Sequence, residues 1–487
     1  MSRRVIGPAA LCSRRSDSHF ADGYVGLAKL AAEAVAHDPT MNVKGIMSRS
    51  EIRTFMDRML GTDDRRALYV VAVLASVGWT DDKEAEGKAI ASSFGMDWNE
   101  VRYKVDAFHN RLGIVPRGGR YRYISPTPLG IYLAVEAWNT FPDLLKSLPN
   151  ALPSADARDS YNQRLRSMAS NAHAREFARS GLDFFFRLDR FLDVYEVRRW
   201  AALAAADPAK ASRGILAALS NAGIQERKRI EGGARRELVW TLVRLAWKAS
   251  CFHDAVMALA LLGEAENETW ANNASAEFVA RFDVGLGGTA VPYAERLKTL
   301  DEVLSVGRSS LTRLAVQALG RVHSHGSSRA ELGPISDEPP EPEWRPSNGR
   351  EHFECIAQAF ARLTAIARAG AIELKADLVK IASDLAMVLR EGPARRVVAE
   401  FFDSVRASYP DTRETLQQSI FDVLRREKKY WKQLSAEELA EIESIHSRFE
   451  DASLGARLRQ HVGRGSVDRD EPADLLGLAS ELITSSA

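Results

Sequence analysis

The chain has little cysteine, no long apolar run and no excess of charge of either sign. Its three cysteines, Cys12, Cys251 and Cys355, lie far apart and form no CxxC pair, which excludes a disulfide framework and a local zinc knuckle. No stretch approaches the roughly 18 unbroken apolar residues that a membrane-spanning helix needs. With 66 basic against 65 acidic residues, the chain has no overall electrostatic preference for nucleic acid or anionic membranes. These absences favour a cytoplasmic protein without a membrane partner.

The sequence also lacks the motifs of the common catalytic sites. It contains no GxxxxGK[ST], HExxH or GxSxG string, and no pattern of a parallel sheet, the usual platform for nucleotide chemistry. The string nearest to a phosphate loop, Glu86-Gly87-Lys88-Ala89, lacks the earlier glycine and the magnesium-binding hydroxyl, and it lies inside a predicted helix. We therefore predict no catalytic residue, no bound cofactor, no metal site and no enzymatic activity in this chain.

Residues 63–150 have the pattern of a winged-helix domain. Apolar residues at helical spacing predict a first helix that runs to Val77 and stops at Gly78, a second over about 84–94, and a third after the N-cap Asp97. Two β-rich runs around the turn at 117–120 then predict a hairpin. Three helices and a two-stranded wing make a winged helix, a variant of the helix-turn-helix arrangement.

A winged helix can bind DNA, and this domain offers basic side chains for such a role. The DNA contacts under this alternative are the following five: Arg102, Lys104, Arg117, Arg120 and Arg122. Glu100 and Asp106 lie beside them on the third helix and would repel phosphates. We therefore prefer a structural role for the domain. The alternative, DNA binding, predicts an affinity for DNA that falls steeply as salt is added.

Beyond Pro153 the chain is predicted to be almost entirely helical. Short helices joined by short turns pack as antiparallel pairs, and pairs of about 40 residues are typical of HEAT-type repeats. Asp411-x-x-Glu414 and Ser435-x-x-Glu438 are predicted capping boxes. Apolar periodicity is strong at 182–200, 209–220, 234–248, 252–262, 275–282, 293–305, 309–322, 352–369, 376–391, 394–407, 412–426 and 436–450. No consensus repeat recurs, so we predict a mainly α fold in which the winged helix is followed by an irregular, HEAT-like α-solenoid.

The segment 323–350 interrupts this pattern because it is short of large apolar residues and rich in proline, glycine and serine. It is predicted to be a linker or long surface loop, with Trp344 docking its far end. His323 and His325 could bind a metal ion, but no cysteine or third histidine lies near them at a ligand spacing. We interpret the two histidines as part of a solvated loop.

One group of polar residues stands out between two predicted helices: Glu264, Glu266, Asn267, Asn272 and Asn273. In one interpretation Glu266, Asn267, Asn272 and Asn273 form a polar pocket or partner site at this junction. In the other interpretation, which we prefer, they cap helices or satisfy backbone groups of the loop, as Asn and Asp usually do at such positions.

Four pieces of sequence carry a resemblance to a known family. In order along the chain they are Asp22-Gly-Tyr-Val-Gly-Leu-Ala28, the winged helix ending in Tyr123-Ile-Ser-Pro-Thr-Pro-Leu-Gly-Ile-Tyr-Leu133, the series Leu245-Ala-Trp247, Glu266-Asn267, Asn272-Asn273-Ala274 and Gly288-Thr289, and Pro342-Glu-Trp-Arg-Pro346. Together they resemble the C-terminal portion of large bacterial STAND-type NTPases, many of which are implicated in antiphage defence. The chain departs from that family at Val25, where the lid motif usually has proline, and in lacking the Walker-bearing sheet.

The resemblance implies a division of the chain into functional parts. Its expected parts are a disordered tail (1–19), a helical lid remnant (20–62), the winged helix (63–150), a helical repeat domain (151–322), the linker (323–350), a second helical repeat domain (351–465) and a flexible tail (466–487). In the family the helical array senses a trigger, while the lid and winged helix clamp the nucleotide core. The resemblance therefore implies a truncated, split or partner-dependent regulatory module. It would recognise a protein trigger, and ATP would belong to a missing or partner NTPase core.

Overall fold

The computed structural model describes residues 50–61, 64–323, 335 and 341–450, together with a few positions near each end of the chain. The described chain is mostly helical, which confirms the predicted mainly α fold. It divides into two compact units, the first made of Met1–Asn273 with Ala330–Pro342 and the second of Ala274–Arg329 with Glu343–Ala487. The predicted tail 1–19 lies outside the described residues, as does most of the predicted lid remnant 20–62.

The first unit begins with helices around a small antiparallel sheet. Its strands have the order β1-β3-β2, and Arg122 of β3 pairs with Val77 of β1 and with Arg117 of β2. The elements are α4 (Ser50–Leu60), α5 (Arg66–Ala72), β1 (Val77–Gly78), the 3-10 turn η1 (Asp81–Lys83), α6 (Glu84–Ser93), α7 (Trp98–Leu112), β2 (Arg117–Gly118), β3 (Tyr121–Arg122) and α8 (Thr127–Thr140).

Helix α7 begins and ends where the sequence predicts. The Asp97 side chain accepts hydrogen bonds from the amides of the first turn, and Gly113 ends the helix at φ 71°. The first predicted helix, in contrast, ends at Ala72 instead of Val77. Gly78 is instead a strand residue that pairs with Tyr121 of β3. A Cβ at Gly78 would lie 2.2 Å from the Lys83 carbonyl oxygen, and the Gly78 amide donates to Glu86 Oε2 at 3.1 Å. The glycine thus permits a close backbone approach and does not cap a helix.

The rest of the first unit consists of short helices and 3-10 turns. Its elements are α9 (Pro142–Ala151), α10 (Ala155–Arg166), α11 (Ala172–Gly181), η2 (Leu182–Phe185), η3 (Leu188–Phe191), α12 (Val194–Leu203), α13 (Pro208–Ser220), α14 (Ile224–Arg227), α15 (Gly232–Trp247) and α16 (Phe252–Glu264). The single helix predicted over 182–200 is wrong. Asp193 instead caps a new helix, α12, and Phe191 of the preceding turn packs edge-on against Trp200 at 5.4 Å.

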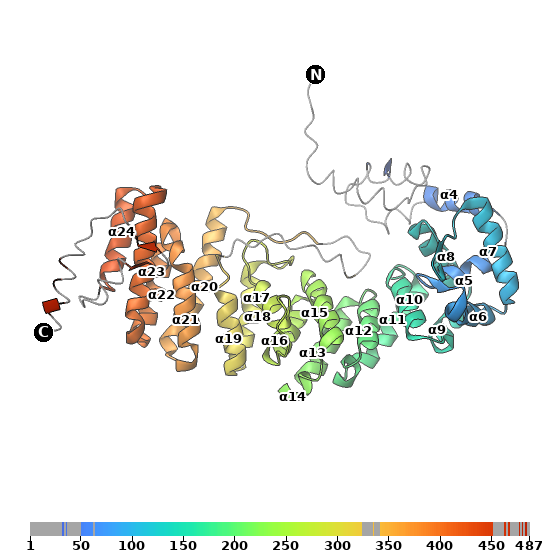
Figure 1. Ribbon diagram of the computed structural model, residues 1–487, viewed down its shortest axis with the longest axis horizontal. Coiled ribbons are helices and arrows are strands. Elements are labelled where there is room, and N and C mark those ends of the chain that lie inside the picture. Colours follow the sequence, from blue (N-terminus) through green and yellow to red (C-terminus); the bar gives the residue numbers. More distant parts are fainter. Residues whose placement is uncertain are drawn as a thin grey trace, which may run out of the picture. The chain divides into compact units, whose positions relative to one another are not determined.

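The second unit is also helical. Within it α20 contacts α22, α21 contacts α23, and α23 contacts α24, so that these helices lie side by side (Figure 1). Its elements are α17 (Ala274–Ala280), α18 (Tyr293–Ser305), α19 (Ser309–Leu319), α20 (Gly349–Ala369), η4 (Ile372–Leu374), α21 (Lys375–Leu385), η5 (Ala386–Arg390), α22 (Gly392–Ser408), η6 (Pro410–Thr412), α23 (Arg413–Arg426), the π-turn η7 (Glu427–Trp431), α24 (Ala436–Ser447), β4 (Val462–Gly463) and β5 (Ser466–Val467).

The far end of the predicted linker docks as expected. The Trp344 amide donates to the Thr289 carbonyl oxygen at 2.9 Å, and the Arg296 guanidinium lies 5.2 Å from the Trp344 ring centroid. The division between the two units, however, also cuts the chain at Asn273, inside the segment 151–322 that was expected to be one repeat domain.

Of the two capping boxes predicted in the second unit, one forms. Ser435 accepts from the Glu438 amide at 3.2 Å, and Glu438 Oε2 accepts from the Ser435 amide at 2.9 Å. Asp411 instead lies inside η6 and forms an ion pair with Lys375. A proline at 410 starts a 3-10 turn before the helix, which removes Asp411 from the capping position.

A buried carboxylate, Glu427, holds the π-turn that follows α23. Burial raises its pKa, but hydrogen bonds from the amides of Leu434 and Gln433 and an ion pair with Arg390 at 2.9 Å outweigh burial, so the pKa lies below its ordinary value of 4.5. A lowered pKa means that the stabilisation is present above pH 4.5 and disappears as the pH falls through the folded-state value.

We expect Glu427→Gln to lower the free energy of unfolding at pH 7 by about 2 kcal/mol, because hydrogen bonds to a charged group are lost. The difference from the wild type should shrink as the pH is lowered from 5 toward 3. Urea unfolding at a series of pH values measures it. A difference that stays constant over this range would contradict the account.

Candidate functional site

The four residues predicted as a polar junction follow α16 in the first unit; they are Glu266, Asn267, the exposed Asn272, and Asn273. Asn267 Nδ2 donates to the Lys228 carbonyl oxygen at 2.7 Å, and Asn273 Nδ2 donates to the Glu268 carbonyl oxygen at 3.0 Å. Glu266 Oε1 accepts from the amides of Asn267 and Glu268 at 3.2 and 3.3 Å. In each of these hydrogen bonds a side chain of the junction binds a backbone group of a loop. This agrees with the interpretation that the junction residues satisfy backbone groups.

Two buried arginines, Arg227 and Arg235, lie next to this junction, and Arg235 pairs with Glu266 at 3.1 Å. Arg227 pairs with Glu264 at 2.9 Å, and both side chains are almost completely buried. Arg227 Nη1 also donates to the Leu261 carbonyl oxygen at 2.8 Å, and Arg235 Nη2 donates to that of Leu262 at 2.6 Å. The last carbonyl groups of a helix have no partner within the helix. The arginines therefore stabilise the C-terminal end of α16 by donating to its last carbonyl groups.

The basic residues proposed for DNA contact differ in exposure. Arg122 is buried, with only 1% of its surface exposed, and its guanidinium donates to the Val115 carbonyl oxygen and pairs with Asp106. It also lies 5.6 Å from the Trp79 ring centroid. Burial lowers the pKa of Arg122, although Asp106 opposes this effect. The side chain belongs to the core of the small sheet and does not face solvent.

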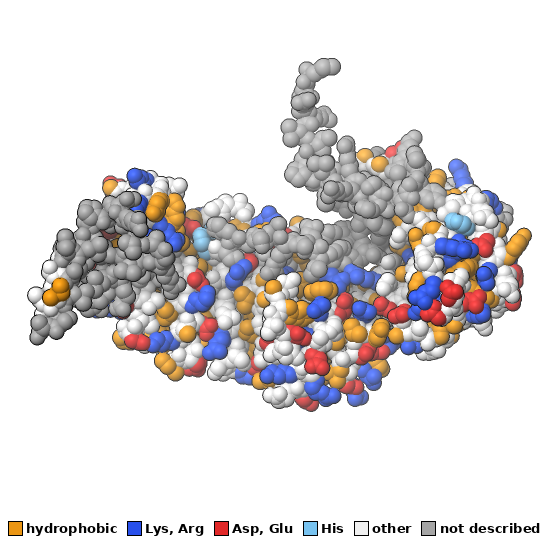
Figure 2. Space-filling view, in the orientation of Figure 1, with side chains coloured by type: hydrophobic (Ala, Val, Ile, Leu, Met, Phe, Trp, Pro, Cys, Tyr) orange, Lys and Arg blue, Asp and Glu red, His pale blue; other side chains and the backbone are white. Residues whose placement is uncertain are grey.

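Most of the other predicted DNA contacts have acidic partners. Arg102 pairs with Glu84 at 3.5 Å, Lys104 with Glu100 at 2.8 Å, and Arg120 with Asp82. Arg117 is exposed and forms no ion pair with a residue that the structure describes. On the face drawn in Figure 2, basic and acidic side chains are interspersed over the described surface. This mixed charge weakens attraction to a phosphate backbone.

The small-sheet region is joined to α10 by a set of buried and partly buried polar contacts. Ser160 Oγ accepts from the Ser76 amide at 2.9 Å and donates to the Ser76 carbonyl oxygen at 2.7 Å, while the Ala75 amide donates to the Ser160 carbonyl oxygen at 3.0 Å. Arg164 donates to the Leu74 carbonyl oxygen through Nε and Nη2 at 3.3 and 3.2 Å. Burial lowers the pKa of Arg164 to about 10. These contacts link residues 74–76 to α10.

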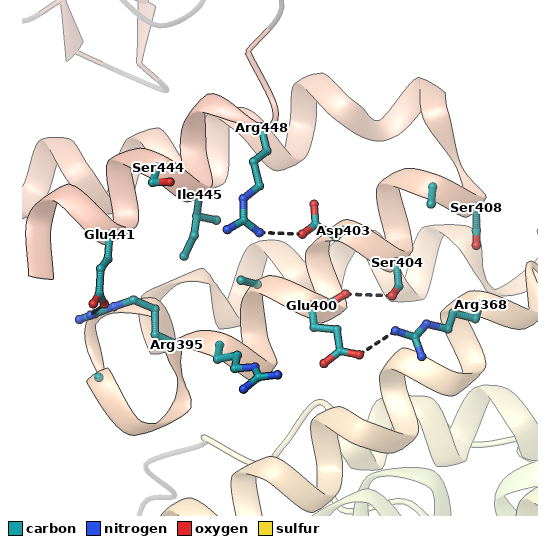
Figure 3. Close-up of a pocket in the computed structure, with 14 residues that line it drawn as sticks. Arg368, Arg395, Glu400, Asp403, Ser404, Ser408, Glu441, Ser444, Ile445 and Arg448 are labelled. Carbon is teal, nitrogen blue, oxygen red and sulfur yellow. Dashed lines mark hydrogen bonds and ion pairs between the residues drawn. The ribbon is translucent and has the colours of Figure 1, made fainter.

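A groove of about 1050 Å³ in the second unit lies between α20, α22 and α24 (Figure 3). Charged side chains from all three helices line it. They comprise four arginines, Arg368, Arg395, Arg396 and Arg448, and three carboxylates, Glu400, Asp403 and Glu441. Four positive against three negative groups leave one positive charge in excess. We call this surface the arginine groove.

Ion pairs join the segments that line the arginine groove. Arg368 pairs with Glu400 at 2.7 Å, Arg448 with Asp403 at 3.0 Å, and Arg395 with Glu441 (Figure 3). Arg396 is exposed and forms no ion pair with a described residue. The excess positive charge of the groove therefore resides on Arg396, and this side chain is available to a carboxylate of a partner.

The remaining lining residues are small or apolar. Ser404 Oγ donates to the Glu400 carbonyl oxygen at 2.8 Å, and Ser408, Ser444, the buried Ile445 and three small residues complete the surface. A groove with apolar and hydroxyl-bearing walls and separate charges suits an extended or helical peptide.

Sequence reasoning does not identify the arginine groove. Its residues lie on three helices whose sequences are separated by intervening helices, and each helix taken alone has the charged outer face of an ordinary amphipathic helix. A signal existed in the adjacent pair Arg395-Arg396, since one of two neighbouring arginines on a helix must point away from the core. Arg395 is buried and donates to the Leu389 carbonyl oxygen at 2.8 Å, whereas Arg396 faces solvent.

None of the helices in the described part of the chain combines the length and the apolar character that crossing a membrane requires. Comparisons with protein-family models, with curated proteins and with solved structures give no match for this chain.

Proposed function

We propose that the chain is a non-catalytic recognition module that binds an acidic segment of a protein trigger in the arginine groove. The main support for this proposal is that Arg396 is exposed in a groove whose other charged side chains already form ion pairs. A partner carboxylate could bind Arg396 without displacing an existing ion pair of the groove.

In this proposal the region of α5 to α8 transmits the state of the helical parts to a separate NTPase module. The order α5-β1-α6-α7-β2-β3 supports its assignment as a winged helix. The Ser160 and Arg164 contacts support transmission because a movement of α10 would carry residues 74–76 with it. The sequence resemblance to STAND-type NTPases, and with it a role in antiviral defence, is the basis for naming an NTPase as the partner.

The DNA-binding alternative has less support. Arg122 is buried, and Arg102, Lys104 and Arg120 each pair with a carboxylate. Among the five predicted contacts Arg117 alone is both exposed and without a described acidic partner. One such side chain provides too little phosphate contact for the steep salt dependence that DNA binding shows.

Selection from a displayed library of random peptides tests the recognition of acidic segments by the full chain. We expect enriched sequences to be acidic and to bind less tightly as salt is added. Arg396→Glu should weaken their binding about tenfold, a change equivalent to about 1.4 kcal/mol. Lys380→Glu is the matched control, because Lys380 is exposed on α21 outside the groove and should leave binding unchanged. Equal affinities for wild type and Arg396→Glu would refute the proposal.

A further inference from the structure

Three potential metal ligands from distant parts of the sequence converge in the second unit. They are His323, which follows α19, His352 in the first turn of α20, and Glu391, which directly precedes α22. Each offers one ligand atom, and the three atoms lie within 4.8 Å of one another. The cluster is separate from the arginine groove, whose lining includes none of the three.

The contact between His323 and Glu391 has the spacing of two ligands that share a metal ion. His323 Nδ1 lies 3.4 Å from Glu391 Oε1, which is longer than a good N–H···O hydrogen bond. Two ligand atoms, each about 2.1 Å from a tetrahedrally coordinated metal ion, stand about 3.4 Å apart. Little movement of these two side chains would therefore be needed to receive an ion.

Glu391 lies at the start of α22 but does not cap this helix with its side chain. Glu391 is the N-cap of α22, where Ser, Thr, Asp or Asn are preferred, and its side chain makes no capping hydrogen bond. Its backbone carbonyl oxygen alone serves the helix, accepting from the amides of Ala394 and Arg395. The side chain is 29% exposed and that of His323 is 19% exposed, so both are partly held in place and still reachable by an ion.

We propose that His323, His352 and Glu391 bind one divalent transition-metal ion, with Zn²⁺ as the best fit. Two imidazoles and one carboxylate suit zinc, whereas magnesium and calcium prefer oxygen ligands alone. Three protein ligands leave a fourth position for water. His352 and Glu391 lie at the N-terminal ends of α20 and α22, which carry partial positive charge. This charge repels a cation and weakens its binding, so we expect a dissociation constant on the order of micromolar. The bound ion holds together the segments that follow α19 and precede α22. The sequence prediction of a solvated, metal-free His323 did not consider His352 and Glu391, because these residues lie far from His323 in the sequence; His325 lies outside the described residues.

Titration of the chelator-treated full chain with ZnCl₂ in a calorimeter tests the site. We expect one equivalent to bind, and His352→Gln and Glu391→Gln each to weaken binding at least tenfold. His253→Gln, at an exposed histidine of the first unit, is the matched control and should keep wild-type affinity. Wild type without zinc binding, or full binding in both ligand variants, would overturn the proposal.

X-ray absorption of the zinc-loaded wild type provides a measurement that does not depend on how the variants fold. The proposal predicts the scattering of two imidazole rings together with oxygen ligands, at about 2.0 to 2.2 Å. A zinc shell without two imidazoles would equally overturn it.

Discussion

Glu264→Gln should destabilise the first unit by about 3 to 5 kcal/mol, the largest effect that we expect from a single substitution in this chain. The substitution leaves Arg227 buried without its counter-charge, since the two side chains are 2% and 0% exposed. The melting temperature should fall by about 10 °C. Differential scanning calorimetry at pH 7 measures this change.

A double variant separates the value of the pair from the cost of an isolated charge. Arg227→Met with Glu264→Leu removes both charges and should cost less than Glu264→Gln alone, because no unpaired charge remains buried. Lys146→Gln is a control for an exposed pair, that of Lys146 with Asp143, and should leave the melting temperature unchanged. A Glu264→Gln variant that melts within 2 °C of the wild type would contradict the conclusion that Arg227 and Glu264 form a buried ion pair.

Gly87→Val should destabilise the region of α5 to α8 by about 3 kcal/mol, because the core around α6 has no space for a side chain. A Cβ at this position would lie 2.2 Å from Trp98 Cη2 and 2.9 Å from the Gly78 carbonyl oxygen. Trp98 cannot move away easily, since its ring packs 4.7 Å from that of Trp79 and its Nε1 donates to Glu84 at 2.9 Å.

Urea unfolding followed by tryptophan fluorescence measures the effect of Gly87→Val. Ala85→Val on the same helix is the matched control: Ala85 is exposed, so this change tests the helix propensity of valine alone and should cost well under 1 kcal/mol. Equal stabilities of the two valine variants would show that the packing around Gly87 is wrong. Gly87 belongs to the string nearest to a phosphate loop, and the structure gives this glycine a packing role inside α6.

The elements best predicted from the sequence are those fixed by local chemistry. Asp97 and Gly113 set the two ends of α7, and the Ser435–Glu438 box starts α24. Local signals failed where a distant contact decided the conformation. Gly78 looked like a helix cap but occupies a strand whose partner, β3, lies more than forty residues later. Asp411 looked like an N-cap, but it pairs with Lys375.

The candidate sites were harder to predict than the helices. The arginine groove combines Arg368, Arg396 and Arg448 from three helices, and the proposed zinc ligands come from three segments with no common motif. Helical periodicity tells which face of a helix is buried but not which exposed faces meet in space. The junction residues Glu266 and Asn267 were visible in the sequence because of their polarity, and their contacts are to nearby loop backbone.

Hydrogen–deuterium exchange of the full chain with and without a selected acidic peptide tests the central claim most directly. If the arginine groove is the recognition surface, the peptide will slow exchange in α22 and α24, and Arg396→Glu will reduce this protection when the peptide concentration is close to the wild-type dissociation constant. Protection confined to α5–α8, or protection of α22 and α24 that is equal in the wild type and in Arg396→Glu, would contradict the assignment of this groove as the site of recognition.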